Sequence, residues 1–298
     1  MAYESYAEFL DALEKAGELI RVSEPIATEL EITELADREM KKPGGGKALL
    51  IEQPTVNGEV SPMPVAINTM GSVKRMAMAL GAESVGAVAE ELGSLVQAKP
   101  PTGLRDAMAL LGQALGLRHA RPKKVKRGPC KEVIHRFDSP ASRTEPWPNA
   151  ADVNDPSTLT PNPSTLLNLP IMQCWPLDGG RFLTLPCVVT RDPDTGDRNL
   201  GMYRMQVYDD QSTGMHWQLQ KVAARHGRRY YETSERMPVA VFLGGDPVYP
   251  FCATAPMPDG LDEFLLAGYL RRKSVEMVQC ETCDLEVPAN ADIVIEGY

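Results

Sequence analysis

Apolar positions near the start of the chain recur at intervals of three and four residues, which is the spacing of one helix face. Ser5 and Glu8 form a capping-box pattern at the start of this helix, and Gly17 ends it. The same kinds of pattern predict further helices at residues 29–40, 72–80, 84–96 and 105–115, and strands at residues 19–22, 48–52 and 64–68. Residues 1–116 are therefore predicted to form a mixed α/β domain.

The pattern changes after Leu169, where short apolar runs alternate with turn sequences. Two longer stretches predict helices at residues 216–225 and 261–269. Strands are predicted at residues 182–190, 199–208, 238–244, 275–278 and 292–296. Residues 169–298 are thus expected to form a β-rich domain of the barrel type, which makes the chain an α+β protein. Residues 117–168 would join the two domains as a basic segment followed by an extended coil.

Composition narrows the class of protein. The chain has 298 residues, of which 43% are hydrophobic and 24% charged, and these are the values of a soluble globular protein. The longest apolar runs are too short to cross a bilayer, and the first residues show no secretory signal, so we expect a cytoplasmic protein without a membrane span. A net charge of −9 argues against a nucleic-acid partner.

Six cysteines lie between residues 130 and 283. Cys280 and Cys283 form a single CxxC pair. A zinc ribbon needs a second pair, and a redox CxxC would open a helix after a strand, whereas this pair precedes Val287 and Pro288. We therefore expect reduced, buried cysteines rather than a metal or redox centre.

The segment with the most chemistry is Asn199-Leu-Gly-Met-Tyr-Arg204, followed by Thr213-Gly-Met-His-Trp217. It places an amide, a fixed cation and one of four histidines in one predicted hairpin, and Glu263 follows later. An amide oxygen, an imidazole and a carboxylate suit Mn²⁺ or Mg²⁺, and an arginine suits a phosphate or carboxylate. Taken singly, each residue also has a plain structural explanation, as a turn, helix-start or first-turn residue.

At these motifs the sequence resembles the UbiD family of prenylated-flavin-dependent decarboxylases. The resemblance covers essentially the whole chain, and within the family it is most similar to members of menaquinone-type pathways. The motifs that carry it include Leu169-Pro-Ile-Met-Gln-Cys-Trp-Pro-Leu-Asp-Gly-Gly180, Asp192-Pro-Asp-Thr-Gly-Asp-Arg-Asn-Leu-Gly-Met-Tyr-Arg-Met-Gln206, Gly214-Met-His-Trp217 and Val287-Pro-Ala-Asn-Ala-Asp-Ile-Val-Ile-Glu-Gly297.

The resemblance implies an N-terminal α/β domain followed by a split β-barrel that binds prenylated FMN. A C-terminal domain used in oligomerisation would be absent from these 298 residues. Asn199, His216 and Glu263 match the family's metal ligands, which bridge Mn²⁺ (or Mg²⁺) to the flavin phosphate, and K⁺ is a further expectation. The acidic proton donor of the family would lie beyond Tyr298.

The remaining site residues also come from the resemblance. Arg204 matches the active-site arginine that faces the substrate carboxylate. Positions that line or hold the cofactor match Leu200, Gly201, Met202, Tyr203, Met215 and Lys221. The alternatives are ordinary strand packing for the strand residues and a solvated helix position for Lys221. Trp175 and Trp217 could stack on the flavin, although core packing is the preferred explanation.

The expected activity is reversible, non-oxidative decarboxylation of an aromatic or α,β-unsaturated carboxylic acid. A flavin prenyltransferase would supply the cofactor, and the protein would form a homo-oligomer or require a C-terminal partner subunit. The main alternative is a cofactor- and metal-binding fragment that is inactive without a separate C-terminal part. A folded remnant that binds no cofactor and an oxidoreductase that uses ordinary FMN are two further alternatives.

Overall fold

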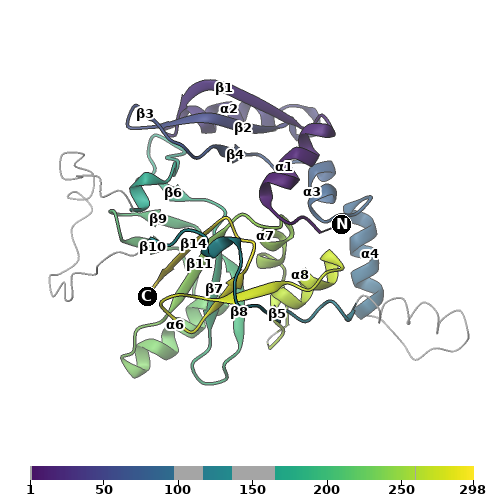
Figure 1. The fold of residues 1–298 in the computed structure, drawn as a ribbon, viewed down its shortest axis with the longest axis vertical. Coiled ribbons are helices and arrows are strands. Elements are labelled where there is room, and N and C mark those ends of the chain that lie inside the picture. Colours follow the sequence, from purple (N-terminus) through teal and green to yellow (C-terminus); the bar gives the residue numbers. More distant parts are fainter. Residues whose placement is uncertain (1, 97–116, 136–164, 259) are drawn as a thin grey trace, which may run out of the picture.

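The computed structural model describes residues 2–96, 117–135, 165–258 and 260–298, and Figure 1 shows two parts. An N-terminal part carries β1–β4 with its helices, and a β-rich part lies beside it. The helix predicted at residues 105–115 lies outside the described residues. The division into domains at residues 116 and 168 stays a prediction.

The N-terminal part is one sheet with helices packed against it (Figure 1). β2 is its central strand, because it pairs with β1 in parallel and with β3 and β4 antiparallel. The strands are β1 (Leu19–Ala27), β2 (Ala48–Val56), β3 (Glu59–Val60) and β4 (Val65–Ile67). The helices are α1 (Tyr6–Lys15), α2 (Glu31–Met40), η1 (Pro43–Gly45), α3 (Val73–Ala79) and α4 (Val85–Val96).

Apolar side chains of β2 point alternately to the two faces of this sheet, and a hydrophobic cluster lies on each face. Leu50 packs in one cluster with Phe9 of α1, whereas its neighbours Leu49 and Ile51 pack in another with Ile32 of α2. Successive side chains of a strand point to opposite faces, so the two helices cover opposite sides. The predicted helix start at Ser5 is confirmed, since its side chain accepts a hydrogen bond from the Glu8 amide.

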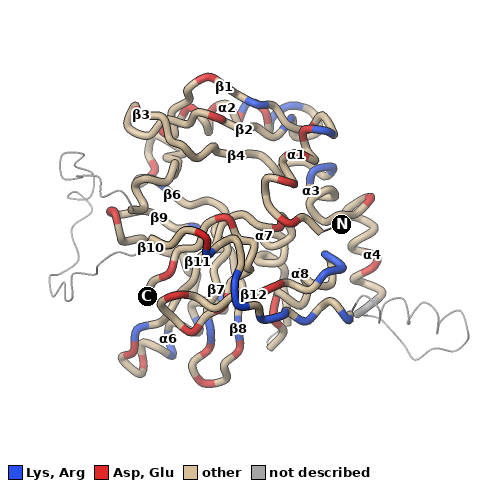
Figure 2. The backbone as a smooth tube through the Cα atoms, in the orientation of Figure 1, with Lys and Arg blue, Asp and Glu red and all other residues tan. Residues whose placement is uncertain are grey.

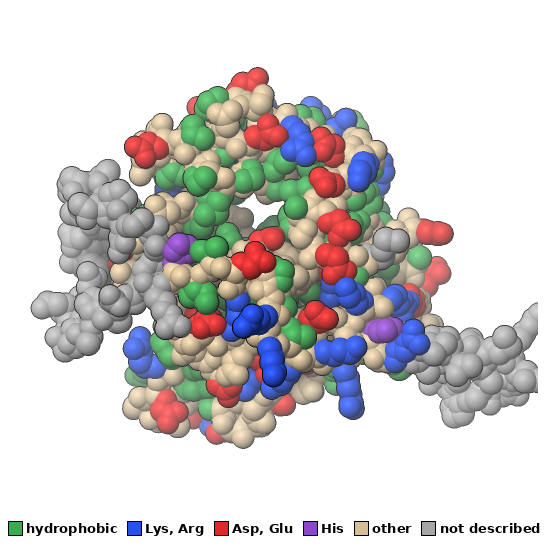
Figure 3. All heavy atoms as spheres, viewed as in Figure 1, with side chains coloured by type: hydrophobic (Ala, Val, Ile, Leu, Met, Phe, Trp, Pro, Cys, Tyr) green, Lys and Arg blue, Asp and Glu red, His purple; other side chains and the backbone are tan. Residues whose placement is uncertain are grey.

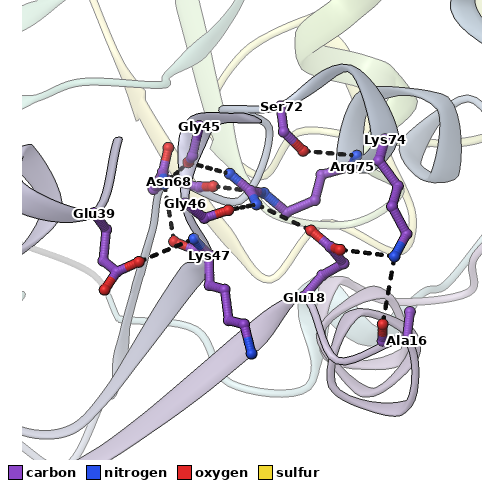
Figure 4. Close-up of polar contacts among 10 residues, drawn as sticks. All are labelled: Ala16, Glu18, Glu39, Gly45, Gly46, Lys47, Asn68, Ser72, Lys74 and Arg75. Carbon is purple, nitrogen blue, oxygen red and sulfur yellow. Dashed lines mark hydrogen bonds and ion pairs between the residues drawn. The ribbon is translucent and has the colours of Figure 1, made fainter. Parts of the chain in front are cut away.

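A fully buried arginine fastens the loop around η1 to the rest of the N-terminal part (Figure 4). The Arg75 guanidinium donates to the carbonyls of Asn68 at 3.1 Å, Gly45 at 3.0 Å and Gly46 at 2.5 Å. It also pairs with the Glu18 carboxylate at 3.2 Å. These bonds satisfy a cation that would otherwise be too costly to bury.

The β-rich part is built from short strands and three α-helices in the described residues. Its strands are β5 (Lys123–Lys124), β6 (Phe182–Leu183), β7 (Cys187–Arg191), β8 (Arg198–Met202), β9 (Met205–Val207), β10 (Thr213–Met215), β11 (Val239–Leu243), β12 (Glu276–Gln279), β13 (Glu286–Pro288) and β14 (Ile293–Gly297). Its helices are α6 (Val222–Thr233), α7 (Val248–Ala253) and α8 (Glu263–Arg271), with short 3₁₀ turns η2 (Pro129–Lys131) and η4 (Leu166–Asn168).

These strands form three sheets, with the orders β14-β11-β7-β8, β10-β9-β6 and β13-β12-β5. Each is open among the described residues, so a closed barrel is not observed. β5 comes from the predicted basic connector and pairs in parallel with β12. Figure 2 shows several Lys and Arg residues in succession along this segment.

Two predicted strands are wrong in their extent. Residues 182–190 divide into β6 and β7, and residues 199–208 divide into β8 and β9. In each case the halves belong to different sheets, so the chain passes from one sheet to the other at the break. Pro186 lies at the first break, where it can donate no ladder hydrogen bond. The second break falls at Tyr203 and Arg204.

The predicted helix at residues 216–225 is also wrong, because α6 begins only at Val222. Lys221 has an extended backbone, with φ −71° and ψ 146°, and serves as the N-cap. The short helix α7 was not predicted, since Pro247 and Pro250 argue against a helix in a sequence pattern. The helix at residues 261–269 is confirmed in type, as α8.

A buried polar contact joins the N-terminus to the β-rich part. Arg271 and Asp246 form an ion pair at 2.7 Å with almost no exposure of either side chain. The Tyr3 amide donates to the same carboxylate oxygen, Asp246 Oδ2, at 2.9 Å. Figure 3 shows an opening elsewhere between the two parts, bordered partly by hydrophobic side chains. Within the described residues, no helix is both long and apolar enough to span a membrane.

Candidate functional site

A pocket of about 420 Å³ lies between β8, α6 and the segment that leads into α8. Its lining combines carboxylates with cations, one amide and one imidazole. The polar and charged lining residues are Asp192, Thr195, Asp197, Arg198, Asn199, Arg225, His226, Arg228, Arg229, Glu232 and Glu263. A cavity with convergent charged groups is the expected setting for a small anionic ligand or a cation.

Two of the predicted metal ligands meet at this pocket. Asn199 lies on β8 and Glu263 is the first residue of α8, and both are buried. The Leu200 amide donates to Glu263 Oε2 at 2.8 Å, which holds the carboxylate against the strand. The Asn199 Nδ2 is directed toward the hydroxyls of Thr190 and Tyr203, both at 3.4 Å. Its Oδ1 is therefore the atom available to a cation.

The electrostatics of Glu263 suit the binding of a cation. Burial raises the pKa of Glu263 to about 7, and the hydrogen bond from the Leu200 amide offsets part of that rise. A carboxylate in this setting is short of solvation, and a dication beside it would favour the charged form. The two oxygen donors thus fit a hard cation, in keeping with the chemistry of Mn²⁺ or Mg²⁺.

Arg198 positions the start of α8 and hence Glu263. Its guanidinium donates to Asp262 at 2.9 Å and to Glu286 at 2.7 Å, and it lies 5.1 Å from the centre of the Phe264 ring. Asp262 in turn caps α8 by accepting from the Phe264 amide. These contacts link β8 to α8 next to the predicted metal ligands, because Arg198 precedes Asn199 and Asp262 precedes Glu263 in the chain.

His226 lines the pocket, and sequence reasoning missed it. Its Nδ1 lies 3.0 Å from the Thr190 hydroxyl, and its Nε2 lies 3.8 Å from Asp192. Burial lowers the pKa of His226, so the neutral ring is favoured. The predicted helix ended at Arg225, one residue short. Extending its periodicity through the buried Ala223 would have found the histidine.

His216 is not among the residues that line this pocket. It is exposed, it follows β10, and its amide donates to the Arg204 carbonyl at 3.0 Å. Arg204 is also exposed, with its guanidinium 4.9 Å from the centre of the Phe182 ring. The structure therefore brings Arg204 and His216 together, and it brings Asn199 and Glu263 together in the pocket.

Several predicted cofactor-lining residues lie on or next to β8, close to the break at Tyr203 and Arg204 between β8 and β9. Leu200 and Met202 belong to β8, as does Gly201. A Cβ at Gly201 would lie 2.3 Å from the Tyr203 ring, so only glycine lets that ring fold back over the strand. Tyr203 is also edge-on to Trp217, at 6.4 Å between ring centres.

The last two predicted cofactor-binding residues, Met215 and Lys221, follow the break between β8 and β9 in the chain. Met215 pairs with Met205 across β10 and β9, and Lys221 is an exposed N-cap beside the pocket-lining Val222. The indole Nε1 of Trp217 is buried and has no hydrogen-bond acceptor among the described residues. This unpaired donor is the kind of group that a polar ligand satisfies.

Comparison with known families agrees with the motifs. Residues 149–298 match the 3-octaprenyl-4-hydroxybenzoate carboxy-lyase Rift-related domain, and residues 10–95 match the N-terminal domain of the same family. The chain therefore belongs to the UbiD family of carboxy-lyases. An uncharacterized protein from Archaeoglobus fulgidus is 40% identical over 299 residues, and one from Aquifex aeolicus is 39% identical over 296 residues. The chain spans 55% of the length of each, and 100% and 99% of its own length is covered.

Solved structures of UbiD-class enzymes are similar to this one. An evolved dimeric form of HmfF from Pelotomaculum thermopropionicum, in complex with prFMN, matches with a TM-score of 0.74 and 26% identity. That match covers 99% of this chain and 57% of HmfF. The closed form of vanillic acid decarboxylase from Sedimentibacter hydroxybenzoicus shares the fold, with a TM-score of 0.75 and 24% identity over 100% of this chain and 55% of its own.

Proposed function

We propose that this chain is the cofactor-binding portion of a decarboxylase that uses prenylated FMN. The substrate would be an aromatic or α,β-unsaturated carboxylic acid, and the reaction reversible and non-oxidative. The observation that carries the proposal is the convergence of Asn199 and Glu263 at one pocket in a chain of the UbiD family. The sheets linked by β6–β7 and β8–β9 would form the split barrel that holds the flavin.

The metal would bind between the two buried oxygen donors. Asn199 Oδ1 and the Glu263 carboxylate would hold Mn²⁺ or Mg²⁺ against the flavin phosphate, with K⁺ nearby. The resemblance assigns the third ligand to His216, whereas the pocket itself offers the imidazole of His226. Loss of Mn²⁺ affinity in His226→Gln but not in His216→Gln would decide for the pocket histidine, and the reverse result for His216.

The flavin phosphate would find cations on one side of the pocket. Arg225, Arg228 and Arg229 line it from α6, and Lys221 stands at the start of that helix. Arginine binds phosphate oxygens in two-point fashion, and a helix start adds a favourable dipole. These groups support the assignment of Lys221 to the phosphate end of the cofactor.

The reactive end of the flavin would lie near the break between β8 and β9. When bound, prenylated FMN supplies an electrophilic centre that accepts the electron pair left by departing CO₂. Arg204 would neutralise and aim the substrate carboxylate, and the backbone of Met202 and Tyr203 would line the ring together with Met215. Trp217 Nε1 would donate to a polar atom of the cofactor. Proton transfer is assigned to no residue of these 298.

A second candidate is a cofactor- and metal-binding fragment or subunit that needs a separate C-terminal part for turnover. The chain spans 55% of the length of each of the two relatives compared above, so the activity of the whole protein is a proposal for this chain. Homo-oligomerisation and a place in a menaquinone-type pathway of the cytoplasm are further parts of the proposal. Turnover that appears only on adding the remaining part of a relative would establish this version.

The proposal is tested by Glu263→Gln with Glu232→Gln as the matched control. Both glutamates line the pocket, but Glu232 is exposed and makes no contact with β8 among its described bonds. Calorimetric titration should show Mn²⁺ and flavin affinity both falling by at least about tenfold in Glu263→Gln, because a metal ligand is lost. The control should be unchanged. Unaltered flavin retention in Glu263→Gln would refute the shared site.

A further inference from the structure

Two thiols and a carboxylate that do not line the pocket meet in the β-rich part. Cys280 and Cys283 lie in the loop between β12 and β13, and Glu296 lies on β14. The two Sγ atoms and a Glu296 carboxylate oxygen all lie within 4.8 Å of one another. The CxxC pattern alone predicted no metal centre, because the sequence has no second cysteine pair. The third candidate ligand comes from a different strand.

Backbone contacts hold this loop in one shape. The Cys280 amide donates to the Leu285 carbonyl at 2.8 Å and closes the loop at its base. Glu296 Oε1 accepts from the Glu281 amide at 2.8 Å, and Oε2 accepts from the Thr282 amide at 2.7 Å. The carboxylate is therefore clamped over the turn that carries both cysteines, and ligands held in place in this way bind with little loss of entropy.

The thiols themselves are arranged as a pair. Both are free cysteines whose Sγ atoms lie within 4.8 Å of each other, with Cys280 buried and Cys283 partly accessible to solvent.

We propose that Cys280, Cys283 and Glu296 bind Zn²⁺, with a water molecule in the fourth position. Two thiolates and one carboxylate are zinc ligands, and three protein ligands plus water complete a tetrahedron. A carboxylate has about four lone pairs, so the hydrogen bonds from the loop leave room for a metal bond. On binding, each thiol releases its proton to solvent, and no electron is transferred.

The two proposed sites differ in their donor atoms, and this difference selects different metal ions. Zn²⁺ prefers the two sulfurs, whereas Mn²⁺ and Mg²⁺ prefer the oxygen donors Asn199 and Glu263. Bound zinc would join the β12–β13 loop to β14, and these belong to different sheets. Zinc should therefore stabilise the contact between two sheets, and it does so whether or not the flavin proposal holds.

Co²⁺ is the direct probe, because thiolate ligands give it an intense near-ultraviolet charge-transfer band. The metal-free full chain, reduced with a phosphine, should develop this band on titration with Co²⁺ and lose it on adding Zn²⁺. Cys283→Ser and Glu296→Gln should each weaken Zn²⁺ binding by at least about tenfold. The matched control Cys174→Ser, a partly exposed cysteine elsewhere in the chain, should bind as the parent does. Glu263→Gln should also retain the band.

Three results would overturn the proposal. One is the absence of a thiolate band, and another is a band that survives both Cys283→Ser and Cys280→Ser. The third is oxidation of the pair to a disulfide in a chain that takes up no metal after reduction. Cys283 is only partly buried, so its serine variant should fold even if the buried Cys280→Ser does not. Circular dichroism of each variant confirms folding before titration.

Discussion

Replacing Arg75 by Met should destabilise the N-terminal part by about 2–4 kcal/mol. The side chain is fully buried and donates to three carbonyls as well as to Glu18. Met fills much of the volume but donates nothing. The Gly46 carbonyl then loses the donor shown in Figure 4, at about 1–3 kcal/mol for an acceptor left unpaired, whereas the Asn68 carbonyl keeps its bond from the Gly71 amide at 3.3 Å. The Gly45 carbonyl keeps its bond from the Asn68 side-chain Nδ2 at 3.0 Å.

Lys74→Met is the matched control, because Lys74 pairs with the same carboxylate at 2.7 Å. Its side chain is 60% exposed, so its loss should cost less than about 1 kcal/mol. Urea unfolding followed by circular dichroism gives the global difference. Hydrogen exchange of peptides from residues 43–51 and 65–80 localises it. Equal stability of the two variants, or unchanged exchange around η1, would refute the view that Arg75 fastens this loop.

Three further predictions concern other links in the account. A hydrogen bond from Lys74 and, to a lesser extent, one from Arg75 lower the pKa of Glu18. The stability that Glu18 contributes should therefore be present at neutral pH and lost as pH falls below about 4.3, so Glu18→Gln should flatten the acid side of the stability profile; an unchanged profile would contradict this. Gly201→Ala should cost about 1–3 kcal/mol, because the new methyl meets the Tyr203 ring, whereas Gly93→Ala in α4 has open space and should be neutral or stabilising; equal melting temperatures would remove the packing argument. Arg204→Ala should leave folding unchanged and abolish decarboxylation in a protein of the relatives' full length, and turnover by that variant would take Arg204 out of its proposed role.

Local signals were enough to predict much of the N-terminal part. The helix that begins after Ser5 follows from a capping residue and a periodic apolar face, and both act within one or two turns. β2 was predicted because its apolar run is bounded by Gly and Pro. The structure extends it to Val56, since it pairs on both sides and buries side chains on both faces.

Long-range effects explain the failures in the β-rich part. Nothing local marks the break at Tyr203 and Arg204, because it arises where the chain crosses between sheets. The helix expected at His216 starts instead at Val222, since residues 213–215 are taken up in pairing with β9. A periodicity count cannot weigh a strand partner that is formed by another segment.

The roles predicted for the site residues stay predictions, and the structure shows only which of these residues lie together. Asn199 and Glu263 were placed together by resemblance, and the pocket unites them. His226 was missed because the predicted helix ended one residue early. Glu296 could not be linked to the cysteine pair, because strand pairing between β11 and β14 sets its position.

The most direct test of the central claim is the absorbance spectrum and metal content of the chain after co-expression with a flavin prenyltransferase. The account predicts a prenylated-flavin spectrum with stoichiometric Mn²⁺, both of which fall in Glu263→Gln. A folded protein that is colourless and free of Mn²⁺ under these conditions, with Glu263→Gln indistinguishable from the parent, would contradict it.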